Sequence, residues 1–305
     1  MGMSAYYTGS GHDDVGSVAT IHRALELGVN FFDTAEGYGP YANEELLGRA
    51  LAGRRDEAVI ATKFGMMLHR TDDSRGLDGS VENARLAIEG SLTRLGTDHI
   101  DIYYQHRMDP ATPVEETVGA LSELIVEGRL RYIGLSEAAP ETIRRAHAVH
   151  PVTALRTEYS LWSRDPEVEL LPLTRELGIG FVAYSPLGRG FLTGTVRSLG
   201  QLDAADFRRS SPRFAGGNLE ANIRIVGRVD AVAAELGVRP GQVALAWLLA
   251  QGEDIAPIPG TKRISHLEEN VAADAVELSV GRLAALDAVA APVGDRYADM
   301  TPVNR

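Results

Sequence analysis

The chain has 305 residues, with 30 lysines and arginines against 42 aspartates and glutamates, so its formal net charge at pH 7 is −12. Like charges are not gathered into blocks, which argues against a nucleic acid or an anionic membrane surface as the main partner. The lack of cysteine excludes disulfides, thiolate metal sites and a cysteine nucleophile.

Seven short β-rich segments follow one another along the chain, and each is predicted to be a strand. They are residues 30–34, 59–64, 100–106, 132–136, 154–160, 180–185 and 256–259. Between them apolar residues recur at helical spacing, as at Val81, Ala84, Ile88, Leu92 and Leu95. This βα repeat predicts a parallel sheet, either open and doubly wound or closed into a barrel.

Capping signals support one of the intervening helices. Thr112, Pro113 and Glu115 predict a capping box with proline at the first helical position. Gly128 stands where the same helix is expected to end.

The choice between sheet and barrel depends on ligand chemistry. An open dinucleotide-binding sheet carries G-x-G-x-x-G after its first strand, and that spacing is missing from this sequence. Polar residues instead end many of the predicted strands: Asp33, Lys63, His106, Ser136, Glu158 and Ser185. In a barrel these ends converge on the face that carries the active site, so we predict a (β/α)₈ TIM barrel forming one domain over residues 1–305.

Four of the polar residues could act together on a carbonyl group. Asp33, Tyr38, Lys63 and His106 supply an acid, a phenol, an amine and an imidazole, although each alone has an ordinary structural explanation. A carbonyl that accepts hydride develops alkoxide charge and needs a proton donor. A tyrosine with a pKa of about 10 becomes a better donor beside an ammonium, which a carboxylate can hold charged. The sequence contains no H-E-x-x-H motif, which would have indicated a metal in place of the tyrosine.

The motifs around these residues resemble the aldo-keto reductase family over nearly the whole chain. The segments that carry the resemblance are FFDTAEGYGPYANEELLGRAL, ATKFG, DIYYQHRMDP, GRLRYIGLSE, TEYSLWSRDPE, FVAYSPLGRGFLTG and IPGTKRISHLEEN. GLSE and YSPLGRG are most similar to the potassium-channel-β-like, bacterial and plant reductases of the family.

The resemblance implies a catalytic tetrad of Asp33, Tyr38, Lys63 and His106, and an NADP(H) cofactor lying across the strand ends. Tyr184 would stack on the nicotinamide, and Ser136 would bind its carboxamide. The loop from Ser185 would embrace the pyrophosphate, and the turn from Gly260 would meet the 2′-phosphate. The full set of implied cofactor-binding residues is Ser136, Glu137, Arg156, Tyr184, Ser185, Pro186, Leu187, Gly188, Gly190, Leu192, Gly260, Thr261, Lys262, Arg263, His266, Glu269 and Asn270.

The chain departs from the family pattern at three places. Arg156 stands where the family commonly has glutamine, and this longer cation could repel an oxidised nicotinamide or reach a substrate anion. Glu137 stands where many members have asparagine. Residues 1–4 resemble the turn after the first barrel strand, so we expect that strand to be truncated here and the native protein to be longer.

The leading hypothesis is an NADPH-dependent reductase of aldehydes or ketones, located in the cytoplasm because the chain has no targeting or membrane-spanning signal. A second hypothesis is an NADP(H)-binding sensor or partner subunit with little turnover. A third is a Schiff-base lyase that uses Lys63. The resemblance implies that loops such as 66–79 and 199–219 set the substrate, while Tyr159 and Trp162 could either line the pocket or simply pack in the core. Neither the substrate nor the oligomeric state follows from the sequence.

Overall fold

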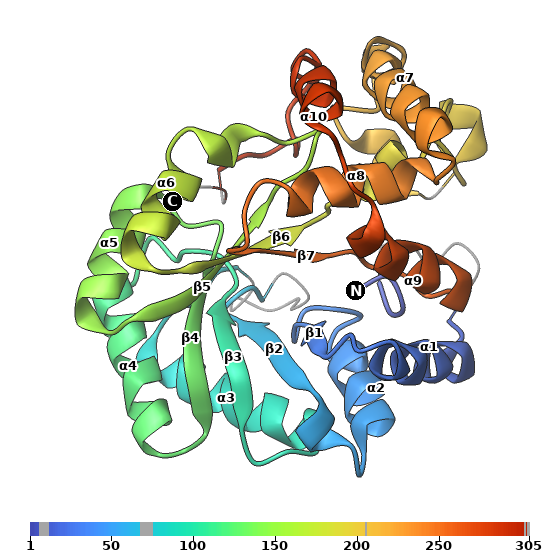
Figure 1. The fold of residues 1–305 in the computed structure, drawn as a ribbon. Coiled ribbons are helices and arrows are strands. Elements are labelled where there is room, and N and C mark those ends of the chain that lie inside the picture. The colour runs from blue at the N-terminus through green and yellow to red at the C-terminus, as the bar shows by residue number, and fades with distance from the viewer. Residues whose placement is uncertain (6–11, 68–75, 205, 302, 304–305) are drawn as a thin grey trace.

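The computed structural model describes residues 1–5, 12–67, 76–204, 206–301 and 303. Its seven strands run parallel in one sheet and pair in chain order, forming a nearly closed barrel (Figure 1). The strands are β1 (Phe31–Asp33), β2 (Val59–Phe64), β3 (Ile100–Gln105), β4 (Leu130–Ser136), β5 (Val152–Glu158), β6 (Gly180–Tyr184) and β7 (Ile255–Ile258). The predicted seven parallel strands are therefore confirmed, with ends that differ by at most two residues.

Helices alternate with the strands, and α2 to α6 cover the outside of the sheet (Figure 1). The helices are α1 (Asp14–Glu26), α2 (Ala42–Leu51), α3 (Val81–Leu95), α4 (Val114–Val126), α5 (Pro140–Val149), α6 (Leu170–Leu177), α7 (Asn218–Leu236), α8 (Pro240–Leu249), α9 (Ile264–Val271) and α10 (Val280–Asp287). Their buried faces and the outward residues of the strands form the main hydrophobic core. This two-layer arrangement buries both faces of the parallel strands.

A second, smaller core fills the inside of the barrel. Its buried members are Ala61, Ile102, Tyr104, Ala154 and Val182, which come from four different strands. Gly134 on β4 makes room for the largest of them, because a Cβ at this position would come within 2.3 Å of the Tyr104 ring. The interior is thus packed with side chains below the carboxyl ends of the strands, where the polar residues lie.

The start of α4 differs from the prediction. Pro113 occupies the N-cap position and no side chain caps the helix. The Thr112 hydroxyl donates to Asp109 instead, at 2.8 Å, so the predicted capping box is wrong. The predicted end is close to the observed one, since Gly128 has a φ of +76° two residues after the helix ends at Val126.

The two edge strands, β1 and β7, are flanked by α1 and α9, which lie side by side (Figure 1). The guanidinium of Arg23 on α1 lies 2.9 Å from Glu268 on α9. The hydroxyl of Thr20 also donates to the carbonyl of Lys262, at 3.5 Å. These contacts hold the segment after β7 against the first helix. In the part of the chain described, no helix has the length and apolar composition needed to cross a membrane.

Candidate active site

Three of the four predicted tetrad residues stand at neighbouring strand ends. Asp33 ends β1, Lys63 lies near the end of β2, and His106 follows β3 directly. Tyr38 comes from the loop between β1 and α2. Buried Glu36 ties this loop to the end of β2 by accepting a hydrogen bond from the Gly65 amide at 3.1 Å. The parallel register of β1, β2 and β3 therefore brings all four side chains to one face of the barrel.

Lys63 and Asp33 form a buried ion pair. The Lys63 Nζ atom donates to Asp33 Oδ1 at 2.7 Å and to the carbonyl of Thr34. Burial lowers the pKa of Lys63 to about 7, against the opposing attraction of Asp33. Although burial also opposes the charge of Asp33, Arg156 and Lys63 hold the pKa of that carboxyl below its ordinary value. The carboxylate is therefore the fixed charge of the pair.

Tyr38 lies among three of the other site residues. Its ring packs edge-on against His106, with 5.9 Å between centroids, and Lys63 Nζ lies 4.9 Å from the ring centre. Its hydroxyl accepts a hydrogen bond from Arg156 Nη2 at 3.2 Å. The phenol thus sits between two cationic side chains in a buried environment.

His106 is an uncharged imidazole in this setting. Burial lowers its pKa well below the ordinary value, and Arg107, Lys63 and Arg156 add to the effect. Its buried Nδ1 atom has no hydrogen-bond partner among the described residues. A neutral ring beside the Tyr38 phenol can offer a hydrogen bond to a substrate oxygen without carrying a charge.

Arg156 makes contacts that the sequence did not predict. Besides its bond to Tyr38, its Nε atom lies 3.2 Å from Asp33 Oδ2, so Asp33 is shared by two cations. Its guanidinium carbon also lies 4.3 Å from the centre of the Tyr184 ring. Arg156 therefore links the predicted catalytic residues to the residue expected beneath the nicotinamide.

Glu137 and Tyr184 form a second buried network. Glu137, with a φ of +55°, follows β4 and accepts a hydrogen bond from the Tyr184 hydroxyl at 2.7 Å. Burial and the nearby Glu137 raise the pKa of Tyr184 well above its ordinary value, so this hydroxyl stays a donor. Ser136 is fully buried before Glu137, and its hydroxyl accepts from Arg107 at 3.3 Å. This network fixes the position of the Tyr184 ring.

Besides Arg107, two residues of this network were missed by sequence analysis. Arg296 donates to both oxygens of Glu137, at 2.9 and 3.0 Å, and the Tyr297 hydroxyl lies 3.0 Å from that of Tyr184. Although burial opposes its charge, Glu137 is held at a lowered pKa by Arg296 and Arg107. Both missed residues lie in an irregular segment near the C-terminus with no periodic pattern, so no local signal could have found them.

The loop after β6 begins with backbone geometry that is uncommon outside glycine. Ser185, Gly188, Arg189 and Gly190 all have positive φ, and a Cβ on Gly188 would meet the Trp162 ring at 2.6 Å. The amides of Gly188, Gly190 and Leu192 donate to carbonyls within the loop. Pro186 is buried, and Leu187 precedes the short helix η3 (Gly188–Thr193). These three amides stabilise the turn, so an anion would have to be bound by other groups here.

The remaining predicted cofactor residues lie apart from the tetrad, around the start of α9. Gly260, Thr261 and Lys262 form the turn after β7, and Arg263 is the N-cap of α9. His266, Glu269 and Asn270 lie on that helix. The helix N-terminus and two adjacent cations form a setting in which an anionic group is favoured.

Two residues that could have lined a substrate pocket belong to the core. Tyr159 packs against Phe181 and Trp247, with centroid distances of 5.8 and 5.6 Å, and Trp162 stacks on Phe191 at 4.1 Å. Both are buried, so of the two roles that the sequence left open the structure favours core packing. Of the loops expected to set the substrate, residues 68–75 of loop 66–79 lie outside the described residues.

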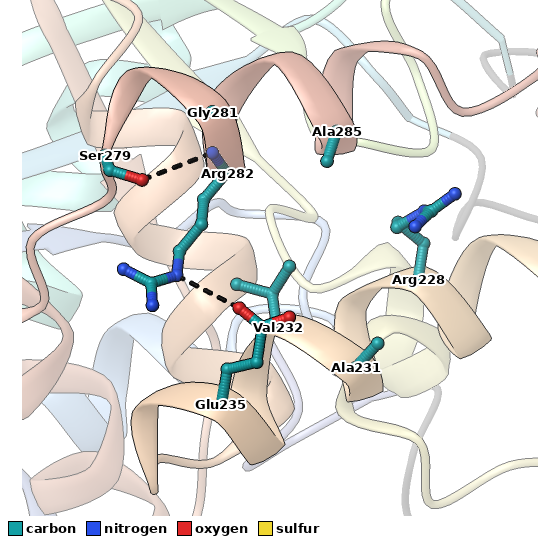
Figure 2. A pocket seen from close by; sticks show the side chains of 8 residues that line it. All are labelled: Arg228, Ala231, Val232, Glu235, Ser279, Gly281, Arg282 and Ala285. Carbon is teal, nitrogen blue, oxygen red and sulfur yellow. Dashed lines mark hydrogen bonds and ion pairs between the residues drawn. The ribbon is translucent and has the colours of Figure 1, made fainter.

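A separate surface cleft lies between α7 and α10 (Figure 2). It is bounded by Arg228, Val232 and Glu235 on one side and by Ser279 and Arg282 on the other. The Arg282 side chain is paired with Glu235 at 3.3 Å across it. No lining residue belongs to a barrel strand, so this cleft is not the site formed by the strand ends.

Comparison with known proteins identifies relatives over almost the full length. A model described as the Aldo/keto reductase family matches residues 1–291. A glycerol dehydrogenase from Gluconobacter oxydans has a similar structure, with a TM-score of 0.83 and 29% identity over 91% of this chain and 86% of that one. A thermostable aldo-keto reductase solved with the inhibitor epalrestat has a TM-score of 0.74 and 29% identity, over 94% of this chain and 91% of that one. A Klebsiella pneumoniae aldo/keto reductase solved with NADP and acetate has a TM-score of 0.72 and 26% identity, over 93% of this chain and 89% of that one.

Proposed function

Because the chain belongs to the aldo/keto reductase family and is therefore an oxidoreductase, we propose that it reduces an aldehyde or ketone to an alcohol with NADPH. Tyr38 gives the proton to the carbonyl oxygen. The observation that carries this proposal is the convergence of Tyr38, Lys63, Asp33 and His106 at the strand ends, with the Tyr38 hydroxyl bound to Arg156.

The charges around Tyr38 suit a proton donor. When the phenol gives up its proton it becomes an anion, and both Lys63 and Arg156 are placed to stabilise that anion. Asp33 keeps the two cations in position through its two oxygens. Neutral His106, packed against the same ring, orients the substrate oxygen toward Tyr38. We also propose that the chain belongs to the potassium-channel-β-like, bacterial and plant reductases of the family, because it carries the GLSE and YSPLGRG motifs.

The chain offers matching surfaces for the cofactor, which supplies the hydride when bound. The Tyr184 ring, held by Glu137 and Tyr297, provides a flat surface beside Arg156 for the nicotinamide. Lys262 and Arg263 at the start of α9 provide positive charge for the 2′-phosphate, which NADH lacks. Ser136 and the loop 185–192 would complete the binding surface between these two ends.

Tyr38→Phe tests the proton donor. The variant keeps the ring but has no proton to give, so kcat for NADPH-dependent reduction of a reactive aromatic aldehyde should fall by about 10²- to 10⁴-fold. NADPH binding, followed by fluorescence titration, should remain within a few-fold of the wild type. Tyr132→Phe is the matched control, because Tyr132 is 52% exposed and lies near the start of β4, whereas the site lies at the carboxyl ends of the strands.

The same assays separate the alternative functions. Normal turnover in Tyr38→Phe would refute the assignment of the proton donor. Tight NADPH binding by the wild type with no reduction across a broad panel of carbonyl compounds would instead support the cofactor sensor. The Schiff-base hypothesis is less well supported, because Lys63 is fully buried and its Nζ atom is engaged by Asp33 and Thr34.

A further inference from the structure

Arg156 is the feature of the site that family membership does not explain. Its side chain projects from β5 into the mouth of the barrel and is almost fully buried. There it contacts Asp33, the hydroxyl of Tyr38 and the face of the Tyr184 ring. These three contacts place a permanent positive charge between the proposed proton donor and the proposed nicotinamide surface.

The surrounding acids do not cancel this charge. Asp33 is shared between Arg156 and Lys63, so two cations face one carboxylate. Glu137, the next acid, is held by both arms of the Arg296 guanidinium. The space beside Tyr184 is therefore positive when Lys63 is protonated, and Arg156 keeps its charge at every pH at which the protein is folded.

We propose that Arg156 sets the redox preference of the site for its cofactor, favouring the reduced nicotinamide over the oxidised one. This inference rests on the proposed function, because it assumes that the nicotinamide stacks on Tyr184. The oxidised ring carries a positive charge and the reduced ring carries none. The Arg156 guanidinium carbon lies over the face of the Tyr184 ring, 4.3 Å from its centre, so a nicotinamide stacked on this ring has the cation as its direct neighbour, and the cation repels the oxidised form.

The consequence is a protein specialised for reduction. NADPH would bind more tightly than NADP⁺, and release of the oxidised cofactor after each turnover would be assisted by the same repulsion. A glutamine at this position, the residue that is common in the family, would keep a hydrogen-bond donor for Tyr38 without the charge. The departure from the family pattern thus has a specific electrostatic effect.

The test measures binding rather than turnover. Dissociation constants for NADPH, NADP⁺ and adenosine 2′,5′-bisphosphate are determined by calorimetry for the wild type, Arg156→Gln and Arg156→Lys. The ratio of the NADP⁺ constant to the NADPH constant should fall about tenfold in Arg156→Gln, which corresponds to ~1.4 kcal/mol. In Arg156→Lys, which keeps the charge, the ratio should stay within about threefold of the wild type.

The bisphosphate is the matched control ligand, because it has the adenosine 2′-phosphate but no nicotinamide. Its affinity should be the same in all three proteins, which also shows that the variants are folded. An unchanged NADP⁺ to NADPH ratio in Arg156→Gln would overturn the inference and leave the proposed function standing. Equal tightening of the bisphosphate would overturn it as well, since the effect would not act on the nicotinamide. A wild type that binds none of the three ligands would overturn the proposed function itself.

Discussion

Lys63 has a charge that depends on its neighbours more than on its own chemistry. Burial costs the ammonium its hydration, and Asp33 can compensate only partly because Arg156 shares the same carboxylate. The pKa of Lys63 consequently falls from 10.5 to about 7. Arg156 cannot respond by losing its proton, so lysine is the member of the trio that titrates. A single arginine can therefore change the working pH of the site.

The pH profile of the reaction tests this coupling. The charged fraction of Lys63 falls as pH rises through about 7, so kcat/KM for carbonyl reduction should decline on the alkaline side of that value. Arg156→Gln removes one cause of the lowered pKa, so its decline should begin at higher pH than that of the wild type. The charged or titratable groups that face Lys63 are the α-amino group of Met1, Asp33 on β1, Tyr38 in the following loop, Glu44 on α2, Tyr104 on β3, His106 after β3 and Arg156 on β5.

The comparison between the two proteins is decisive, because any reduction that consumes a proton slows as pH rises. Steady-state rates are measured from pH 5.5 to 9.5 in buffers of the same ionic strength. Superimposable profiles for the wild type and Arg156→Gln would show that Arg156 does not influence the titrating group.

The C-terminal segment acts on the site as a structural element. Its described residues after α10, 288–301 and 303, contain no helix or strand, yet Arg296 and Tyr297 reach the ends of β4 and β6. The side chains of Arg296 and Glu137 are 3% and 0% exposed, so Arg296 supplies the paired charge that the buried Glu137 carboxylate needs in addition to its hydrogen bond from Tyr184. The guanidinium of Arg189 also lies 4.7 Å from the Tyr297 ring centre, which connects this segment to the loop after β6. The segment therefore supports the surface on which Tyr184 is presented.

Arg296→Met should be strongly destabilising, because it leaves the carboxylate of Glu137 buried without its partner. We expect a loss of about 3–5 kcal/mol in the free energy of unfolding by urea. Arg144→Met is the matched control: Arg144 also makes a two-pronged pair, with Glu176, but both side chains are more than half exposed. That variant should lose no more than about 1 kcal/mol.

Glu137→Gln combined with Arg296→Met should recover part of the stability lost in Arg296→Met alone, because the buried carboxylate charge that Arg296 had paired is then removed. Equal losses in Arg296→Met and Arg144→Met would mean that the buried pair has no special role.

At the scale of the whole molecule, an acidic protein has to bind an anionic cofactor. The net charge of −12 opposes phosphate binding at long range, so affinity has to come from local cations and helix ends. Lys262 and Arg263 lie in the turn and at the N-cap of α9. Contacts between α9 and α1 hold this turn against α1, the helix that precedes the other edge strand, β1. Cofactor binding at both the strand ends and α9 would therefore stabilise the barrel as a unit.

Thermal unfolding tests that expectation. NADPH at about 100 times its dissociation constant should stabilise the fold by about 2.7 kcal/mol and raise Tm by about 4 °C. NADH at the same concentration should give a smaller shift, because it lacks the 2′-phosphate. Lys262→Ala combined with Arg263→Ala should reduce the NADPH shift to that of NADH. Equal shifts for the two cofactors in the wild type would place the 2′-phosphate away from these residues.

The order and kind of the elements can be predicted from the sequence alone. Alternation and helical spacing depend on neighbours along the chain, which is why all seven strands were found, while their ends were less certain. The sequence also indicated which polar residues stand at strand ends, because parallel strands place all those ends on one face. Asp33, Lys63 and His106 were therefore expected together before the structure was known.

The pairing of the buried charges, in contrast, is established by the folded chain and not by local sequence. Arg296 meets Glu137 across 159 residues, and Arg156 meets Tyr38 across 118. Tyr159 and Trp162 became core residues because neighbouring elements enclosed them. Such pairings depend on which remote side chains share a buried space, and no local spacing records that. The physical reason is that burial makes each charge depend on its partner, and partners are assigned by the fold.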